Sequence, residues 1–95
     1  MKLTKEDKEW AKKVKIRDNG KCVVCGATER LNAHHIIPRE QKEHKYDVSN
    51  GISLCPKHHR FSFELSAHQN PLAFLIWMIQ NRRLQLKYLI SLIKS

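Results

Sequence analysis

The chain has 95 residues, of which 18 are Lys or Arg and 9 are Asp or Glu, so its formal net charge is +9 with the six histidines counted as neutral. This length accommodates one small domain and excludes two separate hydrophobic cores. Hydrophobic residues make up 41% and charged residues 28% of the chain, which is typical of a globular rather than a disordered protein. A small core with a high positive charge indicates a domain that is stabilised by a metal ion and binds a polyanion.

Neither a membrane anchor nor an export signal is expected. The longest uninterrupted apolar run, residues 72–79, is much shorter than the roughly 20 residues that span a membrane. The first residues are charged and contain no apolar signal core. We therefore expect a cytoplasmic protein with no membrane partner. In that compartment cysteines more often bind metal than form disulfides.

Residues 4–18 are predicted to form the first helix. Thr4 can cap this helix, Asp7 follows at the capping-box position, and Trp10 begins its apolar face. Turn-forming residues at 18–20 end it. Its other face is basic and carries Lys5, Lys8, Lys12, Lys13, Lys15 and Arg17. This basic face is either a solvated surface or a surface that contacts phosphates, and both interpretations stay open.

The middle of the chain holds nearly all of the cysteines and histidines. We expect a knuckle at residues 22–26, a strand near residues 31–37 that ends at a proline, and a short strand at residues 52–54. A helix is predicted to begin around Pro56, because proline suits the first helical turn. The polar loop at residues 39–50 has no apolar pattern, and long ordered loops of this kind are usually functional.

Residues 70–94 are predicted to form two helices or one bent helix. Asn70 can cap and Pro71 can take the first helical position. The segment 72–79 is apolar on every side, so we expect it to be buried all round. Since a chain of this size offers little room for such burial, residues 72–93 are a candidate homodimer interface.

Two short-spaced pairs of metal-binding side chains stand out. Cys22-x-x-Cys25 and Cys55-x-x-His58 can each hold one ion from a turn. Together they supply three thiolates and one imidazole, a set typical of a closed tetrahedral structural zinc site. The zinc would compensate for the small core by joining the knuckle to the start of the next helix. The alternative is that these are ordinary buried cysteines.

Once these zinc ligands are assigned, His34, His35 and His59 are left over, with Asn50 between them in the sequence. Adjacent residues on a helix lie about 100° apart around its axis. His58 and His59 should therefore face different directions and serve different ions. We expect His44 and His68 to be surface or structural residues, and contact of either one with the metal stays open as the alternative.

At this point the sequence resembles the HNH endonucleases, which are members of the ββα-metal (His-Me finger) nucleases. The matching segments are residues 22–26, 34–38, 49–55 and 58–60, in the order in which the family has them. His58 stands where such members usually have a fourth cysteine, and this exchange keeps a zinc ligand. The resemblance implies an α+β fold with a ββα-metal core and a zinc knuckle, flanked by N- and C-terminal helices. It also implies a single HNH nuclease domain over residues 1–95, with its core at about 17–65 and a C-terminal helical extension at 70–94.

The same resemblance implies the roles of individual residues. His35 resembles the general base that takes a proton from water, and Asn50 resembles the middle residue of the motif, which holds the loop and orients the base or the metal. His34 and His59 resemble the ligands of the catalytic divalent ion, for which Mg²⁺ or Mn²⁺ would leave positions open for phosphate and water. The basic side chains that flank this site are candidate contacts to DNA phosphates: Arg39, Lys57 and Arg60.

The resemblance implies a metal-dependent endonuclease that hydrolyses phosphodiester bonds of double-stranded DNA and contacts its backbone. No recognition helix is visible, so we expect little sequence specificity, and one base with one catalytic ion per chain predicts nicking. Because neighbouring strand residues point to opposite faces, His34 and His35 reach one site only at a twisted strand end. RNA stays open as a substrate. Two other classes also stay open: a non-catalytic zinc-stapled DNA-binding module, and a structural zinc domain that binds a protein partner through residues 72–93.

Overall fold

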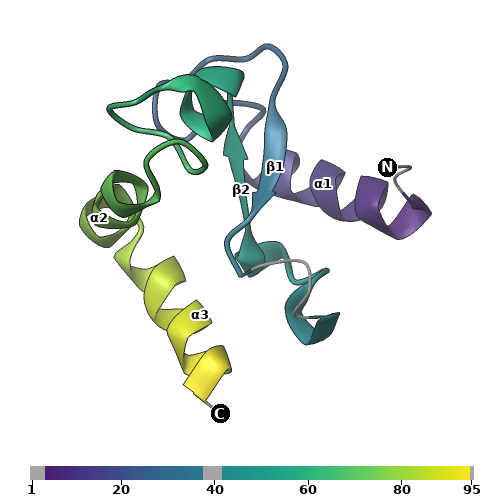
Figure 1. Cartoon of the computed structure of the whole chain (residues 1–95). Coiled ribbons are helices and arrows are strands. Elements are labelled where there is room, and N and C mark those ends of the chain that lie inside the picture. Colours follow the sequence, from purple (N-terminus) through teal and green to yellow (C-terminus); the bar gives the residue numbers. More distant parts are fainter. Residues whose placement is uncertain (1–3, 38–41, 95) are drawn as a thin grey trace. The chain divides into compact units, whose positions relative to one another are not determined.

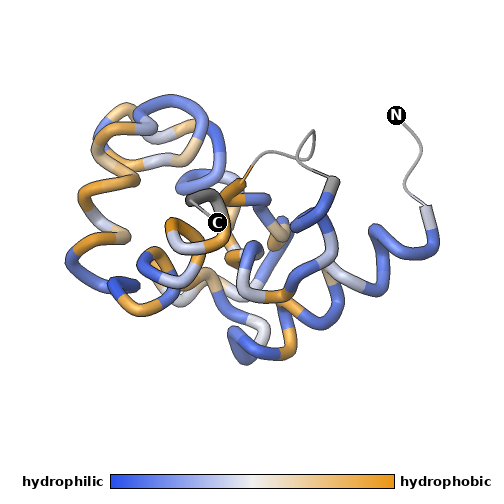
Figure 2. The backbone as a smooth tube through the Cα atoms, turned by 90° about the horizontal axis from the view of Figure 1, so that it is seen from below, coloured by the Kyte–Doolittle hydropathy of each residue, from blue (hydrophilic) through white to orange (hydrophobic). Residues whose placement is uncertain are grey.

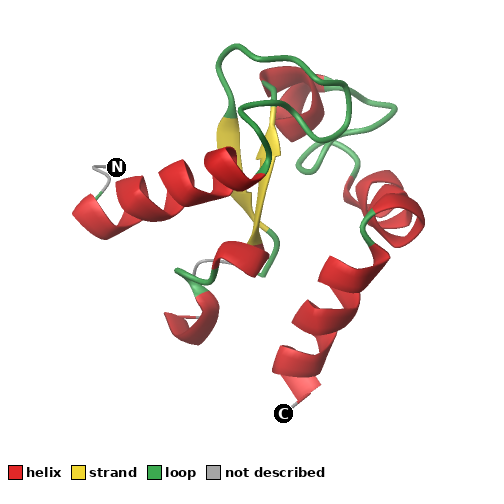
Figure 3. Cartoon of the chain, turned by 180° about the vertical axis from the view of Figure 1, so that it is seen from behind, coloured by secondary structure: helices red, strands yellow, loops and turns green. Residues whose placement is uncertain are grey.

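The computed structural model describes residues 4–37 and 42–94. Within these residues the chain forms three α-helices and one two-stranded antiparallel sheet (Figures 1 and 3), which confirms the α+β class. The chain packs as two compact units, Met1–Pro56 and Lys57–Ser95. None of the helices in the described ranges is long and apolar enough to cross a bilayer.

The first helix of the first unit, α1 (Lys5–Arg17), begins where the sequence predicts. The Thr4 hydroxyl accepts a hydrogen bond from the Asp7 amide (3.1 Å), and the Asp7 carboxylate accepts one from the Thr4 amide (3.0 Å). This capping box satisfies two donors that a helix start would otherwise leave unpaired. Trp10 and Val14 are buried on the inner face, whereas the outer face makes α1 largely hydrophilic in Figure 2.

The sheet pairs β1 (Asn32–His35) with β2 (Gly51–Leu54). The register places His35 opposite Gly51. A Cβ atom at Gly51 would clash with the side chains of Trp10 and Val14, so a glycine at this position lets α1 pack directly on β2. The predicted strands are thus present, although β1 is shorter than the predicted 31–37 segment, whose closing proline at position 38 lies outside the described residues.

Asp18, which follows α1, ties this helix to the sheet. Its buried carboxylate accepts a hydrogen bond from the Ser53 amide (2.9 Å) and pairs with the Arg17 guanidinium (2.8 Å). Burial acts to raise the pKa of Asp18, but the hydrogen bonds from Arg17 and Ser53 hold it below its usual value. Arg17 also donates to the carbonyls of Val48 (2.8 Å) and Gly51 (2.7 Å). The end of α1 therefore anchors both β2 and the loop that precedes it.

The second unit begins with a π-helical turn, η3 (Lys57–Phe61), where the sequence predicted the start of a longer helix. In a continuing α-helix the carbonyls of residues 58 and 59 would accept amides four residues further on. Here the His58 carbonyl accepts from the Ala67 amide (2.9 Å), and the His59 carbonyl accepts from the His68 amide (3.0 Å). The turn stops because these acceptors bond to a later segment of the chain.

Two further helices complete the second unit, α2 (Pro71–Asn81) and α3 (Arg83–Lys94). The Asn70 side chain caps α2 by accepting from the Ala73 amide (3.2 Å). The expectation that residues 72–79 are buried all round is wrong for the chain by itself. Phe74 and Met78 are buried, but other apolar side chains of α2 are exposed by 45% or more, namely Leu72, Leu75, Ile76 and Ile79.

Candidate functional site

Three cysteines of the first unit form a cluster. The sulfur atoms of Cys22, Cys25 and Cys55 lie within 4.8 Å of one another, and those of Cys25 and Cys55 are 3.7 Å apart. Two sulfurs that each lie about 2.3 Å from one tetrahedral zinc ion are separated by roughly 3.8 Å. The spacing of these sulfur atoms therefore fits three thiolates that bind one tetrahedral metal ion such as zinc.

The knuckle owes its shape to backbone hydrogen bonds. The Gly26 amide bonds to the Cys22 carbonyl (2.8 Å), and Gly26 has a φ of 80°, which glycine adopts without strain. The Val23 amide bonds to the Ser53 carbonyl (3.1 Å), which places the knuckle beside β2. Burial acts to raise the pKa of the Cys22 thiol, but hydrogen bonds from backbone amides, first that of Cys55, bring it below its usual value. The thiolate form, which binds metal, is thereby favoured.

His58, the predicted fourth zinc ligand, lies in the second unit. Its Nδ1 is 2.9 Å from the Leu65 carbonyl oxygen. Because a carbonyl can only accept, Nδ1 carries the hydrogen and Nε2 carries the lone pair that can bind a metal ion. The imidazole of His58 is thus held in a tautomer suited to a zinc ligand.

His35, the predicted general base, lies at the end of β1 and contacts both α1 and the loop before β2. Its ring stacks on the indole of Trp10, with centroids 3.8 Å apart and planes 10° apart. Its Nε2 lies 2.9 Å from the Lys45 carbonyl oxygen. The carbonyl accepts, so Nε2 carries the hydrogen and Nδ1 is the basic nitrogen. A neutral imidazole held in this tautomer can accept a proton at Nδ1.

Asn50 is fully buried and joins the end of β1 to the loop. Its Oδ1 accepts from the Ile37 amide, while its Nδ2 donates to the carbonyls of Ile37 (3.0 Å) and His44 (3.2 Å). The Asn50 carbonyl also accepts from the Ile36 amide (3.0 Å). Both groups of the amide are used, so this side chain holds together the two segments that position His35.

Helix α1 also makes hydrogen bonds to the loop that contains Lys45. Trp10 Nε1 donates to the Asp47 carbonyl (2.8 Å), and the Tyr46 hydroxyl donates to the Asp7 carboxylate (3.1 Å). The Lys45 ammonium lies 3.7 Å from the same carboxylate. Hydrogen bonds from Thr4 and Tyr46, together with the positive charge of Lys45, lower the pKa of Asp7 to about 2. The carbonyl that orients His35 therefore belongs to a segment fastened to α1.

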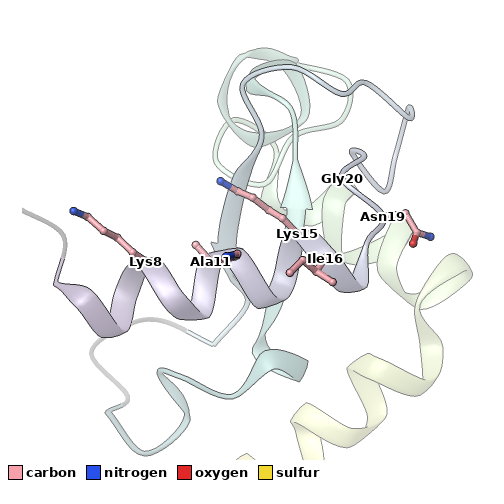
Figure 4. Close-up of a pocket in the computed structure, with 7 residues that line it drawn as sticks. Lys8, Ala11, Lys15, Ile16, Asn19 and Gly20 are labelled. Carbon is pink, nitrogen blue, oxygen red and sulfur yellow. The ribbon is translucent and has the colours of Figure 1, made fainter.

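Two hollows lie along α1. The smaller, of about 190 Å³, is next to His35 and is lined by Asp7, Trp10, Ala11, Lys15, Asn32, Ala33 and His35. The larger is an open hollow of about 640 Å³ on the outer face, which we call the lysine face; it is lined by Lys8, Ala11, Lys12, Lys15, Ile16, Asn19 and Gly20. Figure 4 shows the Lys8 and Lys15 side chains projecting from α1 here. The lysine face offers cations and no general base, so its chemistry suits anion binding.

His34 and His59, the predicted ligands of the divalent ion, lie on different elements. His34 directly precedes His35 at the end of β1. His59 belongs to the second unit and is 8% exposed. Burial, with the nearby His68 and Arg60, lowers the pKa of His59 to about 4. His59 is therefore neutral near pH 7, as a metal ligand must be.

His68, which the sequence suggested to be a surface or structural residue, lies against His59. Their Nε2 atoms are 3.1 Å apart, and the two rings meet edge to face with centroids separated by 4.6 Å. Burial and the charge of Arg60 lower the pKa of His68. Nine positions separate the two residues, a spacing that matches no helix or strand period, so no sequence pattern indicated this contact.

The structure describes two of the three predicted phosphate contacts. Lys57 and Arg60 are exposed on the π-helical turn. Arg39 lies outside the described residues.

Comparison with known proteins supports the motif resemblance. The profile of the family described as HNH endonuclease matches residues 22–62, which run from the first clustered cysteine through both strands to the π-helical turn. No curated protein and no solved structure matches the chain. The match supports the assignment of this segment to the HNH family, whose members are generally endonucleases that depend on metal ions and act on DNA.

Proposed function

We propose that this protein is a metal-dependent endonuclease that nicks double-stranded DNA with little sequence specificity. The observation that carries the proposal is the setting of His35, which is stacked on Trp10 and donates from Nε2 to the Lys45 carbonyl. A histidine held in one tautomer beside a small hollow is what a general base requires. The HNH family match is the second support.

Two kinds of metal ion belong to this proposal. Cys22, Cys25 and Cys55 would hold a structural zinc ion, which the spacing of their sulfur atoms supports, and His58 would be the fourth ligand, as the motif spacing predicts. His34 and His59 would hold an exchangeable Mg²⁺ or Mn²⁺ ion, as the motif resemblance implies. When bound, that ion would stabilise the negative charge that develops on the phosphoryl group. The β1–β2 hairpin and the turn that carries His59 would together form a ββα-metal core.

The chain's own residues account for the proton transfer. His35 Nδ1 takes a proton from the attacking water, which leaves an imidazolium ring. The Lys45 carbonyl accepts the Nε2 hydrogen and so stabilises that positive charge, in the way that a third group orients a histidine base in hydrolases. Asn50 acts as a positioning residue, because its hydrogen bonds join the end of β1 to the loop.

DNA would be held mainly through its phosphates. The lysine face of α1, with the exposed Lys57 and Arg60, supplies cations that do not depend on base sequence. Binding of this kind weakens steeply with salt, because phosphate contacts release counterions.

A second copy of the chain could associate through residues 72–93, whose exposed apolar side chains support that interface. We propose a cytoplasmic location for this activity.

The direct test is incubation of the zinc-loaded protein with supercoiled plasmid and Mg²⁺ or Mn²⁺. The proposal predicts nicked circles that carry 5′-phosphate and 3′-hydroxyl ends, and no product after chelation of the divalent ion. His35→Ala is the matched inactive variant, and His44→Ala is its control on the same loop. Cleavage by His35→Ala at the wild-type rate would exclude the mechanism.

A second function has its own support in the lysine face, which offers anion-binding groups and no general base. A DNA-binding module without catalysis would need this face and the zinc cluster only. It predicts plasmid binding that is unchanged by His35→Ala and no nicking with either divalent ion. The same plasmid experiment therefore separates the two functions.

A further inference from the structure

The second unit contains a pair of imidazoles whose facing nitrogens are unusually close. The Nε2 atoms of His59 and His68 lie 3.1 Å apart, and the rings meet at an interplanar angle of 73°. Two nitrogens that each lie about 2.1 Å from one cation, at an angle between about 90° and 109°, are separated by roughly 3.0 to 3.4 Å. The observed separation falls within this range, so the pair fits ligands that share a divalent ion.

The fold uses several hydrogen bonds to create this proximity. The amides of Ala67 and His68 bond to the carbonyls of His58 and His59, at 2.9 and 3.0 Å. These two bonds align residues 67–68 directly with residues 58–59. The backbone therefore places residue 68 beside residue 59.

The short loop between these segments is itself braced. The Ser66 hydroxyl donates to the Ser62 carbonyl (2.8 Å) and accepts from the Gln69 amide (3.0 Å). The Ser62 hydroxyl accepts from the Leu65 amide (3.0 Å). Ser66 is fully buried. A loop that is braced on both sides can hold His68 at a fixed place, and preorganisation of this kind raises the affinity of a metal site.

We propose that His68 is a ligand of the exchangeable divalent ion, which it binds together with His59 through Nε2. This inference rests on the proposed function in so far as it concerns the same ion, and it adds a ligand that the motif resemblance does not supply. The favoured ion is Mn²⁺ over Mg²⁺, because imidazole nitrogen is a softer ligand than the oxygens that Mg²⁺ prefers.

The alternative explanation is a hydrogen bond between the two imidazoles, in which one ring donates and the other accepts. In that case His68 would orient His59 without touching the ion. The two explanations differ in the number of imidazole nitrogens bound to the metal, and that number can be measured without any DNA.

The experiment uses the full-length zinc-loaded chain with Mn²⁺ alone as the probe. Calorimetric titration gives the Kd of Mn²⁺ for the wild type, His68→Ala and the control His44→Ala, which removes a histidine from the first unit. Pulsed electron paramagnetic resonance of protein labelled with ¹⁵N-histidine counts the imidazole nitrogens coupled to Mn²⁺. Zinc content and circular dichroism establish that each variant is folded.

We expect His68→Ala to weaken Mn²⁺ binding by about tenfold or more and to remove one coupled nitrogen, while His44→Ala changes neither. An unchanged nitrogen count in folded His68→Ala would overturn the inference, and so would a Kd within about twofold of the wild type. Failure of the nuclease proposal would be seen separately. A wild-type protein that binds Mn²⁺ through both histidines but does not nick plasmid would confirm this metal site and contradict the proposed activity.

Discussion

The indole of Trp10 and the imidazole of His35 lie face to face, 3.8 Å apart between centroids and 10° from parallel. Trp10 comes from the middle of α1 and His35 from the end of β1. The same indole donates to the Asp47 carbonyl (2.8 Å), two residues after the carbonyl that bonds to His35. One side chain therefore contacts the base and fastens the segment that orients it.

Removal of this stack should slow cleavage without unfolding the protein. Trp10→Leu keeps an apolar side chain in the core but loses the ring and the indole donor, so we expect the nicking rate to fall by about tenfold. Trp10→Phe keeps a ring and should lose less. Plasmid nicking at saturating Mn²⁺ is the measurement. Val14→Ala, on the same buried face, should lower the melting temperature and leave the rate per folded molecule unchanged. Equal losses of rate in Val14→Ala and Trp10→Leu would contradict a specific role for the stack.

His35→Ala should reduce nicking by at least about a hundredfold, the lower range for loss of a general base. Plasmid binding in a gel-shift assay and zinc content should persist, because His35 is neither a zinc ligand nor part of the lysine face. In the wild type the rate should rise with pH through the range in which imidazoles lose their proton, because only the neutral ring accepts one. A flat profile between pH 5 and 8 at saturating metal would argue against a histidine base.

Cys25→Ser should abolish the tight binding of about one zinc ion per chain and lower the melting temperature. Cys25 is exposed and Cys22 is buried, so the loss of stability in Cys25→Ser reports on the metal rather than on core packing. His58→Ala should weaken zinc binding as well. Elemental analysis after gel filtration measures the zinc content, with Lys21→Ala as a surface control. Full zinc content in Cys25→Ser would be incompatible with the proposed site.

The two metal ions should also respond differently to a chelator. Brief treatment with a chelator should stop nicking while the zinc stays bound, because a closed tetrahedral site releases its ion slowly. Activity should return when Mg²⁺ or Mn²⁺ is added without zinc. Recovery that requires zinc would show that one ion serves both roles.

Asp7 should make the thermal stability of the protein depend on pH under acidic conditions. Its pKa of about 2 in the folded chain lies below the value of about 3.9 expected after unfolding, so the folded state favours the carboxylate. The stabilisation is complete above the unfolded pKa and is lost as the pH falls through the folded pKa. Asp7→Asn should therefore melt below the wild type at pH 7, and the difference should shrink between about pH 4 and pH 2. Thermal melts of both proteins at each pH measure this, and a constant difference would argue against the linkage.

Plasmid should pass first to the nicked circle. One base and one catalytic ion per chain cut one phosphodiester in each encounter, and a second strand of opposite polarity needs another site. Measurement of the amounts of supercoiled, nicked and linear plasmid through the first turnover distinguishes nicking from double-strand cleavage. Linear DNA that appears together with the nicked circle from the start would indicate coupled sites. The exposed apolar residues of α2 would then be the first place to seek a dimer contact, with Leu75→Lys as the disrupting variant.

Short-range features of this protein could be predicted from the sequence. The capping box of Thr4 and Asp7, the Asn70 cap before Pro71 and the Cys-x-x-Cys knuckle each depend on residues a few positions apart. Their geometry follows from local backbone conformation, which the residue types restrict. The HNH motif was also readable, because its pieces occur in a fixed order along the chain.

Tertiary structure alone decided the surroundings of the histidines. The Trp10–His35 stack joins α1 to β1, and the contact between His59 and His68 closes a loop with no periodic spacing. The predicted helix after Pro56 stops as a π-helical turn because the carbonyls of residues 58 and 59 bond to amides of residues 67 and 68. A backbone carbonyl bonds equally well to a near or a distant amide, so its choice depends on how the whole unit packs rather than on the local sequence.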